Sequence, residues 1–175
     1  AGRASYILNS ISAYRSAQFR RSPIAADISF VPALKGPPRA LAATHVMGVW
    51  VVWKFGRAPD LAKEFLLHLT DNARESSLGS ELYNFPSYMG AAAEKNTPVA
   101  QKPAEGLKWI QGQVRSDKFG SLPPDKLKVL ADSLKWSANI GWPGVANPAE
   151  GEIFDTSVTA DMFAKAATGQ LTPKQ

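Results

Sequence analysis

Four stretches of the chain have apolar residues at the spacing of an amphipathic helix. The stretches, with the apolar positions that mark them, are 10–19 (Ile11, Tyr14, Ala17), 58–72 (Leu61, Phe65, Leu69), 123–136 (Leu127, Leu130, Leu134) and 147–168 (Phe154, Val158, Met162). Their ends carry helix signals: Ser10 is a candidate N-cap, Pro59 suits a first turn and Gly169 a stop. We therefore predict four helices, with a further short helix in 76–95 that is followed by an extended loop.

Three other stretches are typical of β-strands. They are 5–9 ("SYILN"), 27–32 ("DISFVP") and 44–55 ("THVMGVWVVWKF"). The last contains the longest apolar run of the chain, which is far shorter than the about 20 residues needed to span a bilayer and has the length of a buried strand. Trp50 and Trp53 are accordingly predicted to be core residues, while 96–106 ("NTPVAQKPAEG") is predicted to be a surface connection. The fold class is therefore α/β, helix-rich with a few short strands, and these strands are too few for a comfortable sheet without partners outside this sequence.

Composition limits the classes of function. The chain has 175 residues, of which 45% are hydrophobic and 20% charged, as in a globular domain. Its net charge of +5 is spread along the chain rather than clustered with aromatic residues, so no nucleic-acid partner is expected. The absence of cysteine excludes disulfides, thiolate metal sites and cysteine nucleophiles.

Residues suited to catalysis are sparse. The chain has no glycine-rich nucleotide fingerprint, and its two histidines, His45 and His68, lie far apart in the sequence without carboxylates at metal-ligand spacing. Glu150 and Glu152 fall in the first turn of a predicted helix, where acidic residues favour the helix dipole. We therefore expect no catalytic residue, no metal and no cofactor. A carbohydrate-active enzyme with Glu150 or Asp155 as acid or base is the alternative, and a helical protein-interaction domain is a third hypothesis.

The irregular stretch 137–148 is the best candidate for ligand binding. Trp142 stands between Gly141 and Pro143, and Trp136 ends the preceding predicted helix. Indole rings on polar, glycine-rich loops stack on sugars and donate one hydrogen bond. For Trp136 core packing is an equally good interpretation, whereas Trp142 favours binding.

Several segments, in their order, resemble the C-terminal half of an extracellular solute-binding protein of ABC importers, in the maltose-binding-protein-like family. These segments are "ILNSIS", "FVPALKGP", "APDLAKEFLLHL" and "FAKAATGQLTPKQ". The family's final helix would begin where "LTPKQ" ends the sequence, so the chain is expected to be a truncated fragment of a longer protein. The resemblance implies a periplasmic binding protein type II-like fold, of which only the C-terminal portion is present.

The resemblance also implies an organisation and a function. Residues 1–43 and 76–175 would belong to the C-terminal lobe, and 44–75 would supply a hinge strand and helix of the other lobe. A small polar, carbohydrate-like solute would bind between the lobes and be delivered to the membrane permease of an ABC importer, in the periplasm or outside the cell. The chain itself would neither span the membrane nor act as an enzyme. The ligand-binding residues expected by this analogy and from the loop aromatics are Asn9, Ser10, Tyr14, His45, Trp136, Trp142, Gly144 and Asn147.

Overall fold

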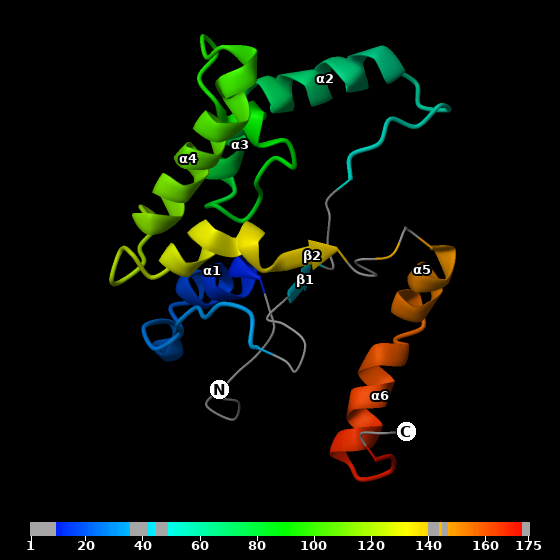
Figure 1. Cartoon of the computed structure of the whole chain (residues 1–175). Helices are drawn as coiled ribbons and strands as arrows, with labels where there is room; N and C mark the ends of the chain where they lie inside the picture. Colours follow the sequence, from blue (N-terminus) through cyan, green and yellow to red (C-terminus); the bar gives the residue numbers. More distant parts are fainter. Residues whose placement is uncertain (1–9, 36–41, 45–48, 140–143, 145–146, 173–175) are drawn as a thin grey trace.

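The described part of the fold is dominated by helices and contains two very short strands. The computed structural model describes residues 10–35, 42–44, 49–139, 144 and 147–172 (Figure 1). More than half of the described residues are helical. In order, the elements are α1 (Ile11–Phe19), η1 (Pro23–Ala25), β1 (Ala42–Thr44), α2 (Pro59–Asp71), α3 (Ala73–Gly79), η2 (Met89–Ala92), η3 (Val99–Gln101), α4 (Lys102–Arg115), η4 (Lys128–Lys135), β2 (Ser137–Asn139), α5 (Pro148–Asp155) and α6 (Val158–Ala167), where η marks a 3₁₀-helix. The predicted helix-rich character with few strands is confirmed.

The ends of the predicted helices follow their sequence signals. Pro59 is in the first turn of α2, next to the acidic Asp60, and the last turn contains His68. At the end of α6, Gly169 has a φ of 73°, which glycine adopts without steric cost. The amide of Gly169 donates to the carbonyl of Ala166, and the amide of Gln170 donates to that of Lys165, at 3.2 and 2.9 Å. This pair of bonds is a Schellman motif, so the predicted stop at Gly169 is confirmed.

The helix predicted over 147–168 is two helices. Ser157 has a φ of 57° and lies between α5 and α6, so the backbone turns at this residue. The side chain of Asn147 accepts a hydrogen bond from the amide of Ala149 at 3.0 Å, which satisfies one free donor at the start of α5.

Helix α4 was not predicted, because its sequence contains Pro103, Gly106 and Gly112. Pro103 lies in the first turn, where its missing amide proton costs nothing. Gly106 is buried against η2, and a Cβ atom built there would lie 1.8 Å from the carbonyl oxygen of Met89. This glycine therefore serves close packing between α4 and η2 rather than a turn.

The helix predicted over 123–136 is a 3₁₀-helix over most of its length. Its tighter winding brings every third residue to the same face. Leu127, just before η4, is fully buried, and Leu130 packs against the core, but Leu134 is 60% exposed. The prediction of Leu134 as an inner residue is therefore wrong, because it assumed α-helical spacing.

The strand predictions mostly fail. Residues 27–32 form no strand, although Ile28 and Phe30 both turn toward the core as their alternation predicted. In the predicted strand 44–55, only Thr44 is in a strand within the described part, and 49–55 pairs with none of the described residues. The predicted strand 5–9 lies outside the described residues. A strand needs a partner to bond with, and an apolar run alone does not supply one.

The predicted burial of the two tryptophans in 44–55 is wrong. Trp50 is 74% exposed and Trp53 is 63% exposed, and the Trp53 ring stacks on Phe55 with 5.2 Å between centroids. The apolar residues of α2 are also incompletely covered, since no residue of this helix is buried. In Figure 1, α2 and the pair α5–α6 extend away from the group formed by α1, α3, α4 and η4.

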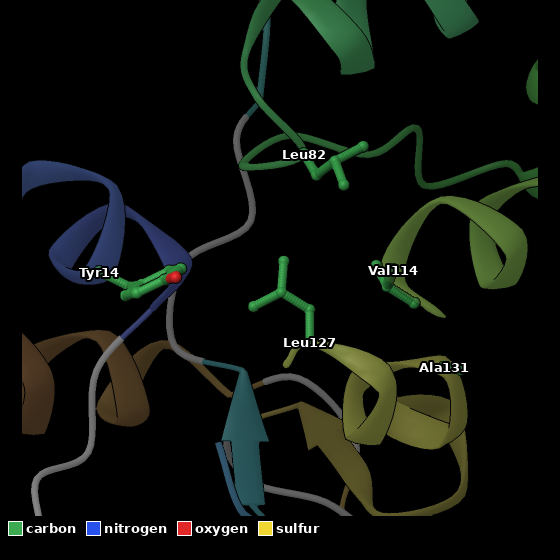
Figure 2. Packing of buried hydrophobic residues seen from close by; sticks show 5 residues of the cluster. All are labelled: Tyr14, Leu82, Val114, Leu127 and Ala131. Atoms are coloured by element: carbon green, nitrogen blue, oxygen red, sulfur yellow. The ribbon is translucent and has the colours of Figure 1, made fainter. Parts of the chain in front are cut away.

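The core is small and joins distant parts of the sequence. Figure 2 shows Tyr14 of α1, Leu82 after α3, Val114 of α4, and Leu127 and Ala131 at η4 converging on one centre. The Tyr14 ring meets Phe30 edge to face, with centroids 5.5 Å apart. Burial of these side chains holds the N-terminal segment 10–30 against α4 and η4.

Candidate functional site

The two strands bring separate parts of the chain together. β1 and β2 are parallel, and the register pairs Ala42 with Ser137, Ala43 with Ala138 and Thr44 with Asn139. Both strands therefore end at the same edge. In parallel α/β sheets, ligands bind at the edge formed by the carboxyl ends of the strands.

Four of the eight predicted ligand residues come after the ends of these strands in the sequence. His45 comes directly after Thr44, and the loop with Trp142, Gly144 and Asn147 comes after Asn139. His45 and Trp142 themselves lie outside the described residues, as does Asn9. Gly144 and Asn147 are exposed. The register thus brings together the ends of the two strands that precede these segments in the sequence.

The remaining predicted residues have different surroundings. Trp136 is half-buried at the C-terminal end of η4, directly before β2. Ser10 is the N-cap residue of α1, but its Oγ lies 2.6 Å from Ser12 Oγ and does not cap the helix. Tyr14 is only 3% exposed, so its ring belongs to the core and has no open face for stacking. This position corrects the prediction of Tyr14 as a ligand residue: the tyrosine is at helical spacing on the inner face of α1.

A buried polar cluster surrounds Tyr14. Arg15 donates two parallel hydrogen bonds to Asp117, from Nη1 to Oδ2 and from Nη2 to Oδ1, both at 2.9 Å. Ser121 Oγ donates to Asp117 Oδ2 and accepts a bond of 3.1 Å from the Tyr14 hydroxyl. The Arg15 and Asp117 residues are 8% and 5% exposed. The sequence gives no sign of the pair formed by Arg15 and Asp117, because the two residues are about a hundred positions apart and belong to no common motif.

Asp117 is held in its ionised form. Burial by itself would raise the pKa of this carboxyl, but the hydrogen bonds from Arg15, Ser121 and the amide of Phe119, with the charge of Arg15, outweigh burial and lower the pKa. The Arg15 Nε also donates to the carbonyl of Glu81 at 3.0 Å, and no buried side-chain nitrogen or oxygen in the described part lacks a partner. A carboxylate with both oxygens occupied is a poor general base. The cluster therefore has a structural role: it connects α1 to the turn after α3 and to the turn after α4.

A second ionic cluster lies on α4. Arg74 Nη2 pairs with Glu105 at 2.7 Å, Nη1 pairs with Glu94, and Nε donates to the carbonyl of Ala92 at 2.6 Å. The guanidinium also lies over the Trp109 ring, 5.2 Å from its centroid. These contacts join α3, the η2 region and α4, so this cluster too has a structural role.

The carboxylates of the alternative hypothesis lie on the surface. Glu150 is half-buried, and Glu152 and Asp155 are exposed, all on α5. Among the residues that the structure describes, no three histidine, aspartate or glutamate side chains gather in an arrangement that could hold a metal ion.

Comparison with protein-family models, with curated proteins and with solved structures found no match for this chain. Within the described residues, no helix is long and apolar enough to cross a membrane.

Proposed function

We propose that this chain is part of a solute-binding protein that captures a small polar solute, of the sugar or polyol class, at the carboxyl ends of β1 and β2. The observation that supports this function is the parallel pairing of Thr44 with Asn139. The two strands end at one sheet edge, and parallel α/β folds bind ligands at that edge, which supports a site formed by the two candidate segments that follow the strands in the sequence. The order of the sequence motifs supports the proposed class of protein, and the strand pairing supports the proposed position of the binding site.

The proposed residues would contact different parts of the solute. His45 and Asn147 supply polar groups for hydroxyls, and the indoles of Trp136 and Trp142 supply flat apolar faces for a sugar ring. Asn147 uses its side-chain oxygen to cap α5, which leaves its amide group to donate. No bond is made or broken in this function, and closure of two lobes around the solute would exclude water.

The wider setting rests on the resemblance of the sequence. It implies a periplasmic binding protein type II-like fold, with 1–43 and 76–175 in one lobe and 44–75 in the hinge and other lobe. It further implies a periplasmic or extracellular location and delivery of the solute to the permease of an ABC importer. The exposed apolar side chains of 49–55 and α2 agree with this division, because in a two-lobed protein they would pack against the rest of the lobe to which 44–75 belongs.

Isothermal titration calorimetry with a panel of mono-, di- and trisaccharides and polyol phosphates tests the proposal. At least one solute should bind with measurable heat. The substitutions His45→Ala and Trp142→Phe should each weaken that binding about tenfold or more, which corresponds to the about 1.4 kcal/mol expected for a lost hydrogen bond or stacking contact.

The chain contains a matched control for each substitution. His68 lies exposed on α2, where its carbonyl and ring meet Asn72, and Trp109 lies on α4 against Arg74. His68→Ala and Trp109→Phe should leave the affinity unchanged. An absence of heat across the whole panel, or equal losses in the controls and in the site variants, would contradict binding at the strand ends. Hydrolysis of a glycoside that Glu150→Gln abolishes would favour the enzyme instead.

A further inference from the structure

We draw no further inference here: the strongest candidate, the exposed apolar segment before α2 with Trp50, Trp53 and Phe55, carries no proposal because nothing in the described part of the structure shows what covers it.

Discussion

At the scale of single residues, Asp117 is a side chain with a large expected effect on stability. Its replacement by asparagine removes the close negative charge that Arg15 faces and leaves the buried guanidinium with only a long contact of 3.9 Å to the exposed carboxylate of Glu81. Breaking a buried pair in this way typically costs about 3–5 kcal/mol of unfolding free energy. Urea unfolding of Asp117→Asn at neutral pH, followed by circular dichroism, measures this loss.

An exposed ion pair provides the matched control. Asp125 pairs with Lys128 at 2.6 Å on the surface, and such pairs contribute about 0–1 kcal/mol. Asp125→Asn should therefore change the unfolding free energy by less than about 1 kcal/mol. If the two variants lose the same stability, the Arg15–Asp117 pair does not hold α1 in the way that its geometry indicates.

The same carboxyl makes the protein sensitive to acid. The pKa of Asp117 is lower in the folded chain than in the unfolded chain, so the unfolded state binds protons more readily as the pH falls. The contribution of Asp117 is complete above the unfolded value of about 3.9 and is lost as the pH falls through the folded pKa. Thermal unfolding between pH 7 and pH 2 should show this loss, and Asp117→Asn should flatten the curve below about pH 4.

A measurement at high salt distinguishes the acid sensitivity due to Asp117 from that due to surface carboxylates. Hydrogen bonds from Lys128 and Lys135 lower the pKa of Asp125 and Asp132 as well, but both pairs face solvent. In 1 M NaCl the screening length is about 3 Å, which weakens the exposed pairs far more than the buried one. The difference between wild type and Asp117→Asn should therefore persist in 1 M NaCl. Its disappearance would assign the acid sensitivity to the surface.

At the scale of elements, the packing of α4 depends on a glycine. In Gly106→Ala the new Cβ would lie 1.8 Å from the carbonyl oxygen of Met89 and 2.8 Å from its carbon, both backbone atoms that have little freedom to move. Forced repacking of this kind costs about 1–3 kcal/mol, which exceeds the gain of up to about 1 kcal/mol in helix propensity. Guanidinium unfolding should show a net loss.

Gly112 of the same helix is the control. A Cβ at this position meets nothing within 4 Å, so Gly112→Ala should raise the unfolding free energy by up to about 1 kcal/mol. Opposite signs for the two substitutions are the expected result. Stabilisation by both would mean that α4 does not lie against η2 as closely as described.

The elements also show which parts of a fold one sequence predicts. Helices α1 and α2 were predictable because their own residues contain the apolar period and the end signals. Helix α4 was not predictable, because Gly106 is needed for a tertiary contact with Met89. In the sequence, such a glycine looks the same as one that ends a helix. The prediction of a buried strand at 49–55 was wrong for a similar reason. The residues are apolar, but a strand is buried only where another segment packs against it, and that contact cannot be read from the segment itself.

At the scale of the molecule, the candidate site was predictable only in part. The local sequence pattern singled out His45 and the 141–147 loop, but it gave no sign that the strands before them, which end at Thr44 and Asn139, are paired. Tyr14 was predicted as a ligand residue but is buried in the core. An aromatic residue near a polar turn has the same local sequence pattern in both situations. A sequence therefore identifies side chains that are suited to binding, but the fold decides which residues lie beside them.

The exposed segment 49–55 predicts how the whole molecule responds to protease. Trp50, Trp53 and Phe55 are each more than 60% exposed and lie in a segment without helix or strand, before α2 (Figure 1). Phe19 and Phe163 are also exposed, but they lie in helices, which resist cleavage until they open. Brief treatment with chymotrypsin should therefore cut first within 50–55, as mass spectrometry of the fragments would show.

The two fragments should remain associated after this cut. Tyr14 and Arg15 tie the N-terminal fragment to the core and to Asp117, and Lys126 of the other fragment donates to the carbonyl of Ala26 at 2.6 Å. Both fragments should therefore elute together from a size-exclusion column and separate only in denaturant. The nicked Asp117→Asn protein should separate at a lower urea concentration, because it lacks the buried ion pair. Free separation of the wild-type fragments in buffer would show that the contacts around α1 are too weak to join the two halves of the chain.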